Sequence, residues 1–266
     1  MTKRSMSVAG AFYPSGCGEC EDMFREFNFL LKKSLNGDEL PAISPKAVIV
    51  PHAGYVYSGF TANIAYRVLQ NNVYFKRAIV IGPSHRVYFE GTSGSFFDLY
   101  ETPCGDFEID TEYLEKLSSV FPVSFYEQAH LEHSTEVQFP FLKYYFPDIK
   151  VIEFVYANED PVRLSKMIEY LLKDRDNAVI ISTDLSHYYD QKRANALDSV
   201  CINAVYALDP SKLKKGCEAC GIIGMEALIR AAKKVGLNSQ ILNYQTSGDI
   251  TGDNSSVVGY MSAALF

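Results

Sequence analysis

Three short runs of β-branched residues each end in a turn that carries a histidine. The runs cover residues 47–50, 78–81 and 178–181, and the histidines that follow them are His52, His85 and His187. Apolar runs of this length and branching are typical of fully buried parallel strands. Because ligands of open α/β sheets bind at the carboxyl ends of such strands, three of the five histidines are expected at the edge where an α/β protein places its chemistry.

Amphipathic helical patterns alternate with these runs. Helices are predicted over residues 19–35, 58–70 and 191–208, and after the capping pairs Asp160-Pro161 and Asp209-Pro210. This alternation indicates βαβ units. We therefore predict an α/β fold with a mostly parallel central sheet and helices on both faces, in a single domain over residues 1–266.

Two segments depart from this alternation. Residues 96–102 and 106–109 flank Pro103-Cys104-Gly105, a pattern typical of an inserted β-hairpin with a glycine-bearing turn. Residues 256–266 alternate apolar and polar side chains and predict a final strand.

Composition narrows the class of protein. The net charge of −7 argues against nucleic acid as a partner, since such a surface needs a basic stripe. No apolar stretch reaches the roughly 18 residues of a membrane span, and no hydrophobic signal region follows the basic start. We expect a cytoplasmic protein whose six cysteines are reduced thiols.

Further candidates for chemistry lie close to the histidines. His133 stands in Glu132-His133-Ser134-Thr135-Glu136, and Asp184 precedes His187 by three residues. One strand-end histidine alone is more often structural than functional, but three on successive strands favour a site. Asp184 and His187 suit an acid/base pair or a ligand with its orienting carboxylate, although Asp184 is equally suited to capping a turn. Glu136 fits the acidic first turn of a helix.

The cysteines include two Cys-x-x-Cys pairs, at residues 17–20 and 217–220. A zinc ribbon is disfavoured because ribbons place such pairs about 15–20 residues apart. Cys220 precedes a predicted helix, where a thiolate is favoured, and is the better single thiol. No serine stands in a nucleophile elbow, and no glycine-rich phosphate loop is present.

These motifs together resemble the ordered signature of the Memo family, whose prokaryotic members are called AmmeMemoRadiSam system protein B. The matching segments are Pro51-His52-Ala53-Gly54-Tyr55, Gly82-Pro83-Ser84-His85, Glu132-His133-Ser134-x-Glu136-x-Gln138-x-Pro140, Asp184-x-Ser186-His187 and Ala219-Cys220-Gly221. The opening residues 9–14, the hairpin and residues 247–260 match as well. The resemblance spans nearly the whole chain.

The resemblance implies a fold similar to class III extradiol (LigB-like) dioxygenases, which hold non-haem iron with two histidines and a carboxylate. In Memo-like proteins the corresponding metal pocket has two histidines and a cysteine, which fall here on His52, His85 and Cys220. His133, Asp184 and His187 fall on the remaining pocket positions as acid/base candidates. The resemblance further implies iron or copper as cofactor, and radical-SAM and AMMECR-type proteins as partners.

A thiolate in place of a carboxylate softens the site toward copper or zinc, or toward iron of altered reactivity. Cys217 competes with Cys220 as the thiol that faces the pocket, and Gly224 stands where the family pattern leads us to expect proline.

Three functions remain open at this stage. The first is a metal-dependent redox protein of unknown substrate. The second is a non-catalytic module that binds a small molecule or a peptide in the same pocket. The third is a hydrolase in which a metal-bound water attacks and His133 or His187 acts as base.

Overall fold

A nine-stranded mixed sheet forms the centre of the protein, whose computed structural model describes residues 1–266. Its strand order is β10-β12-β2-β9-β3-β8-β4-β7, and β11 also pairs with β12. The strands are β2 (Ala47–Val50), β3 (Arg77–Pro83), β4 (Thr92–Gly94), β7 (Val123–Ser124), β8 (Lys150–Tyr156), β9 (Asn177–Ser182), β10 (His187–Tyr189), β11 (Ser239–Thr246) and β12 (Val257–Leu265). The four central strands β2, β9, β3 and β8 run parallel, whereas β12 and β4 flank them antiparallel.

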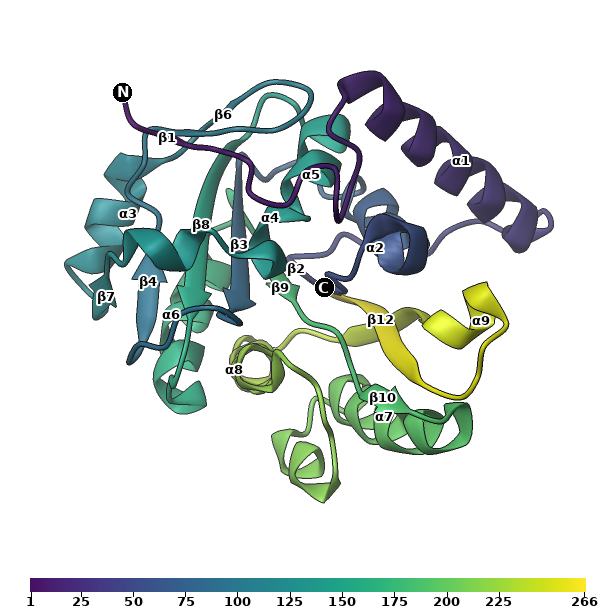
Figure 1. Ribbon diagram of the computed structural model, residues 1–266. Coiled ribbons are helices and arrows are strands. Elements are labelled where there is room, and N and C mark those ends of the chain that lie inside the picture. The colour runs from purple at the N-terminus through teal and green to yellow at the C-terminus, as the bar shows by residue number, and fades with distance from the viewer.

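Helices cover both faces of this sheet (Figure 1). The α-helices are α1 (Cys17–Leu35), α2 (Tyr55–Leu69), α3 (Thr111–Ser118), α4 (His133–Glu136), α5 (Phe139–Tyr145), α6 (Pro161–Lys173), α7 (Gln191–Tyr206), α8 (Ile222–Val235) and α9 (Ser247–Thr251). Two 3-10 helices, η1 (Glu127–His130) and η2 (Pro210–Lys215), complete the list. The structure confirms the predicted α/β fold. The four central strands pair in parallel and β12 pairs antiparallel with its neighbours, whereas at the other edge β4 pairs antiparallel with β8 but parallel with β7.

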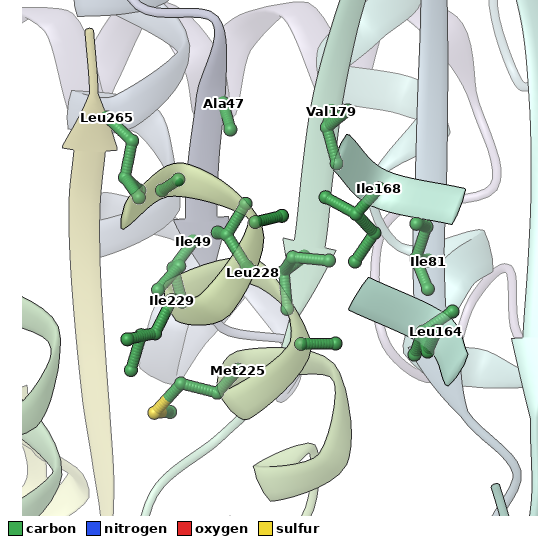
Figure 2. Close-up of a cluster of buried hydrophobic side chains, with 14 of the residues drawn as sticks. Ala47, Ile49, Ile81, Leu164, Ile168, Val179, Met225, Leu228, Ile229 and Leu265 are labelled. Carbon is green, nitrogen blue, oxygen red and sulfur yellow. The ribbon is translucent and has the colours of Figure 1, made fainter. Parts of the chain in front are cut away.

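Alternating side chains of the central strands supply two hydrophobic cores. Ile49 faces a core built with α6, α7 and α8, whereas its neighbours Val48 and Val50 face a second core built with α1, α2 and α5. Figure 2 shows the first of these, where Met225, Leu228 and Ile229 of α8 lie over strands β2 and β9. All four residues of β2 are buried because successive strand residues point to opposite faces and both faces are covered.

The predicted hairpin is present as β5 (Leu99–Tyr100) and β6 (Phe107–Glu108), which pair antiparallel. Strand β1 (Lys3–Arg4) pairs with β5, so the hairpin and the N-terminus form a separate three-stranded sheet. The final strand is confirmed as β12. The third histidine-bearing segment differs from its prediction, because His187 begins the edge strand β10 five residues beyond the end of β9.

A buried arginine holds the N-terminal segment to the body of the protein. Arg4 forms an ion pair with Glu136, donates to the carbonyl of His130 at 2.6 Å and lies over the ring of Tyr100. Glu136 also accepts hydrogen bonds from the backbone N–H groups of Ser7 and Val8. Glu136 therefore anchors residues 3–8, and it does not face the candidate site.

The expectation of six reduced cysteines is wrong. Cys17 is bonded to Cys104, and Cys201 to Cys217, while Cys20 and Cys220 are free. The first bridge joins the start of α1 to the hairpin turn across 87 residues of sequence, with Cα atoms 4.7 Å apart. Composition does not show which thiols become neighbours, because that depends on the tertiary structure.

None of the helices combines the length and apolar character that a membrane crossing requires.

Arg4→Ala is predicted to lower the free energy of unfolding by about 3–5 kcal/mol, because it leaves the Glu136 carboxylate buried and without its partner charge. Urea denaturation followed by circular dichroism measures the effect. Lys3→Ala is the matched control, since Lys3 is exposed, and its unfolding free energy should stay near that of the wild type. Equal stabilities of the two variants would contradict the anchoring role.

The disulfides predict a thiol count. Protein purified without reductant and unfolded in the presence of an aromatic disulfide reagent should yield two reactive thiols per chain, rising to six after reduction. Alkylation during cell lysis followed by mass spectrometry should find Cys20 and Cys220 modified. Six thiols before reduction would show that the bridges are not formed.

Candidate metal centre

The strand order brings two of the predicted histidines to one edge of the sheet. Strands β2 and β3 flank β9 and run parallel to it, so the residues that follow all three strands emerge together. His52 follows β2, His85 follows β3, and Asp184 follows β9. The ring centroids of His52 and His85 lie 5.2 Å apart.

A short helix brings His133 to the same place. His133 is the first residue of α4, and the next residue, Ser134, donates from Oγ to the carbonyl of Pro83 at 2.7 Å. Gly82 permits this approach, because a Cβ at that position would stand 2.6 Å from Ser134 Oγ. The ring of His133 then lies 4.5 Å from that of His85 and 5.4 Å from that of His52.

These three histidines offer a convergent set of ligand atoms. One nitrogen from each of His52, His85 and His133 lies within 4.8 Å of the others. His52 is buried, with 2% of its surface exposed, whereas His85 is exposed and His133 is partly exposed. Three imidazoles from three different segments can therefore contact a single ion.

Glu132 contacts two of these imidazoles with one oxygen. Its Oε1 lies 3.1 Å from Nδ1 of His85 and 2.7 Å from Nδ1 of His133, and its Oε2 accepts the backbone N–H of His85 at 2.7 Å. Burial disfavours the charged carboxylate, but the contacts with His133 and His85 outweigh burial and hold the pKa of Glu132 below its usual value. An ionised Glu132 can only accept hydrogen bonds, so it accepts the Nδ1 proton of His85 and leaves Nε2 of that ring as a lone-pair donor. Nδ1 of His133 lies close to the same carboxylate oxygen without hydrogen-bond geometry.

A serine fixes the ring proton of His52 on Nδ1, as Glu132 does for His85. Ser182 donates its hydroxyl proton to the carbonyl of Ser134, so its oxygen must accept from Nδ1 of His52, 3.0 Å away. Burial, together with the neighbouring His85 and His133, lowers the pKa of His52 well below its ordinary value. His52 is therefore a neutral imidazole with a free lone pair on Nε2.

Cys220 contacts that lone pair. Its Sγ lies 3.3 Å from Nε2 of His52 and accepts the backbone N–H of Asp184 at 3.3 Å. Cys217, the competing thiol, is bonded to Cys201 in a disulfide. Burial and the nearby Asp184 raise the pKa of Cys220 to about 12, so the sulfur carries a proton that can be donated to His52.

The position of Cys220 depends on close packing of the following glycine. A Cβ at Gly221 would stand 2.5 Å from Cβ of Thr183, so only glycine lets the turn before α8 approach the end of β9. Gly224, where the family pattern suggests proline, donates its backbone N–H to the hydroxyl of Tyr156 at 3.1 Å. Proline has no N–H and could not make this bond.

Two cavities border the histidine cluster. A cavity of about 610 Å³ is lined by the three acid/base candidates His133, Asp184 and His187. A second cavity of about 430 Å³ is lined by His85 and Cys220. His52 is buried and lines neither cavity. Different members of the cluster therefore line different cavities.

Asp184 and His187 line the larger cavity but do not hydrogen-bond to one another. Oδ1 of Asp184 accepts the backbone N–H of His52 at 2.7 Å, and its Oδ2 lies 3.9 Å from Nε2 of His52. Burial raises the pKa of Asp184 above its usual value. Asp184 thus faces the histidine cluster, while the imidazole of His187 is free to meet a molecule in the cavity.

Several residues of the site were missed by sequence reasoning. Glu132 and Ser182 orient the imidazoles, and Gly82 and Gly221 permit the close approaches. The sequence showed that Glu132 is next to His133, but only the tertiary structure shows that Glu132 also bonds to His85. His130, left unassigned, is buried between Glu153 and Ser93 and has no access to the site.

The α/β fold and the histidine cluster at the carboxyl edge of its sheet define a class of proteins with a buried candidate metal pocket. The chain belongs to the Memo-like protein family, whose family model matches residues 4–264. A MEMO1 family protein of Methanobrevibacter smithii is 34% identical over 281 residues, covering 97% of this chain and 98% of that protein. A MEMO1 family protein of Aquifex aeolicus is 34% identical and covers 98% of each chain, and one of Archaeoglobus fulgidus is 32% identical with 97% of each chain covered.

Glu132→Gln is predicted to remove the contribution that the ionised Glu132 carboxylate makes to the free energy of unfolding, a contribution that is lost at low pH. The pKa of Glu132 is depressed in the folded chain relative to its ordinary value of 4.5, so its contribution is fully present above that pH and is lost as pH falls toward the folded pKa. The unfolding free energy of E132Q should therefore decline less steeply than that of the wild type between about pH 5 and pH 3. Urea titrations at several pH values measure the slopes, with Glu39→Gln, an exposed site, as control. Parallel slopes for E132Q and the wild type would contradict the proposed charge state.

Proposed function

We propose that this protein is a metal-dependent redox protein that binds iron or copper at the histidine cluster and acts on a small molecule in the larger cavity. The observation that carries the proposal is the convergence of His52, His85 and His133, whose nitrogens lie within 4.8 Å of one another. Cys220, 3.3 Å from Nε2 of His52, is the fourth candidate donor.

The donor set fits a first-row transition metal. Nδ1 of His52 bonds to a hydroxyl and Nδ1 of His85 to a carboxylate, which is how metal-binding histidines are usually oriented, and Nδ1 of His133 lies 2.7 Å from the same carboxylate. Imidazole and thiolate suit iron, copper and zinc, whereas calcium and magnesium prefer oxygen. A bound iron or copper ion would supply one-electron chemistry, which zinc would not.

The chain's own groups would position the substrate and move protons. His187 lines the larger cavity without a bond to Asp184 and is the proposed proton donor or acceptor. Asp184 would help to hold the cluster, because it accepts the backbone N–H of His52. His133 has two candidate roles, ligand and acid/base group, and its nitrogen's place among the three supports the role of ligand.

Cys220 would change its protonation state on metal binding. In the metal-free site its S–H is directed to the same Nε2 lone pair of His52 that would bind the metal. A metal bound by both groups displaces this proton, so the metal affinity is expected to rise with pH. The radical-SAM and AMMECR-type partners belong to this proposal through the family resemblance alone, and the cytoplasmic location remains a prediction from the sequence.

Metal content of alanine variants tests the ligand set. Loss of a ligand should reduce metal affinity by more than the roughly 10–100-fold that loss of an orienting neighbour costs. His52→Ala, His85→Ala and His133→Ala should each lose metal when iron or copper is titrated anaerobically and measured by plasma mass spectrometry. His187→Ala is the matched control and should retain wild-type metal content. Unchanged content in all three variants would refute the metal site.

Cys220→Ser separates the two roles of the thiol. If the thiolate binds copper, the wild type should show a sulfur-to-copper charge-transfer band and release about one additional proton on binding, measured by calorimetry in two buffers. Both signals should vanish in C220S. Identical spectra and proton release would exclude Cys220 as a ligand. A protein that binds metal but consumes neither oxygen, peroxide nor ester probes would instead favour the non-catalytic binding module.

A further inference from the structure

The inner and outer ends of the larger cavity are lined by different kinds of residue. Its inner end holds the buried Asp184 and the partly exposed His133, against whose ring Phe12 packs at 4.8 Å. Its outer end holds exposed side chains from three segments: Tyr57, Tyr188 and Asp253. A ligand that reaches the histidine cluster through this cavity must therefore pass an aromatic and acidic outer end.

The charge of the lining favours cations. None of the 15 lining residues is lysine or arginine, whereas Asp184 and Asp253 are both acidic. Ser255 donates two hydrogen bonds to Oδ1 of Asp253, from its backbone N–H and its hydroxyl. These bonds lower the pKa of Asp253 and keep it ionised, and they leave Oδ2 available to a ligand.

The backbone holds one aromatic ring of the outer end in a costly conformation. Tyr188 has a φ of +65°, in the left-handed region that a bulky side chain rarely adopts. It lies where the pairing of β10 with β12 shifts register between His187 and Tyr189. Its side chain is 78% exposed, so burial gives no compensation for the strain. Strain of this kind persists at binding sites, where it aims a side chain at a ligand.

We infer that the outer end of this cavity binds an organic ammonium group between the rings of Tyr57 and Tyr188 and the carboxylate of Asp253. Aromatic faces attract cations through their quadrupole, and the nearby carboxylate supplies the opposite charge. The inference deepens the proposed function, because it names the substrate class as amines whose other end reaches the histidine cluster. It does not require a metal, so its failure is separable from failure of the metal site.

Three size-matched probes test the charge preference: phenethylammonium, 2-phenylethanol and 3-phenylpropionate. Each is titrated into the full-length protein by calorimetry at low salt, both as purified and after treatment with chelator. Phenethylammonium should bind about tenfold more tightly than 3-phenylpropionate in both preparations, with the alcohol between them. Equal or tighter binding of the carboxylate in the chelator-treated protein, or no measurable binding of the ammonium probe, would overturn the inference.

Variants of the outer end test the residues. Tyr188→Ala should weaken phenethylammonium binding by about twofold to fivefold, the range of an exposed cation–π contact, whereas Tyr188→Phe should retain it, since the ring face makes the contact. Asp253→Asn keeps the acceptor oxygen for Ser255 and should weaken binding by about twofold to fivefold. Asp38→Asn, an exposed substitution of the same charge outside the cavity lining, is the control. Unchanged affinity in both Y188A and D253N would overturn the inference.

Tyr188→Gly distinguishes a functional residue from a structural one. Glycine adopts positive φ without strain, so this variant should unfold at a higher temperature than Y188A. It should nevertheless lose the ammonium preference by the same factor as Y188A. A Y188G variant that binds phenethylammonium as the wild type does would show that Tyr188 has no role in binding.

Discussion

Burial of both faces of β2, β9 and β3 is the constraint on which the rest of the structure depends. Helices cover each face, so the central residues of these strands are apolar on both sides and the strands pair in parallel. Parallel pairing brings their carboxyl ends to one edge of the sheet. His52, His85 and Asp184 are neighbours there because their strands are neighbours, although they are separated by up to 132 residues of sequence.

A network of acceptors then converts neighbouring histidines into a candidate metal site. Glu132 accepts the Nδ1 proton of His85 and Ser182 accepts that of His52, so Nε2 of both rings keeps a lone pair. The sulfur of Cys220 lies 3.3 Å from Nε2 of His52, so the thiol contacts the same lone pair that the proposed metal would use.

The two cavities border different residues of the candidate metal centre. The larger one combines His133, Asp184 and His187 with an outer end of tyrosines and Asp253, while the smaller one reaches His85 and Cys220. The strained backbone of Tyr188 fits this arrangement, because it places a ring at the entrance that the fold itself does not need.

Local patterns in the sequence were enough to predict the α/β fold, the helices over residues 19–35 and 58–70, the hairpin and the final strand. They were also enough to place His52 and His85 at strand ends, because the side-chain period of a buried strand and its turn are local properties. Only the tertiary structure decided that Glu132 contacts both His85 and His133, that Cys220 and not Cys217 faces His52, and that four cysteines pair. These outcomes depend on which distant segments pack together. The hydrophobic periodicity of a sequence gives no information on the distances between segments far apart in the chain.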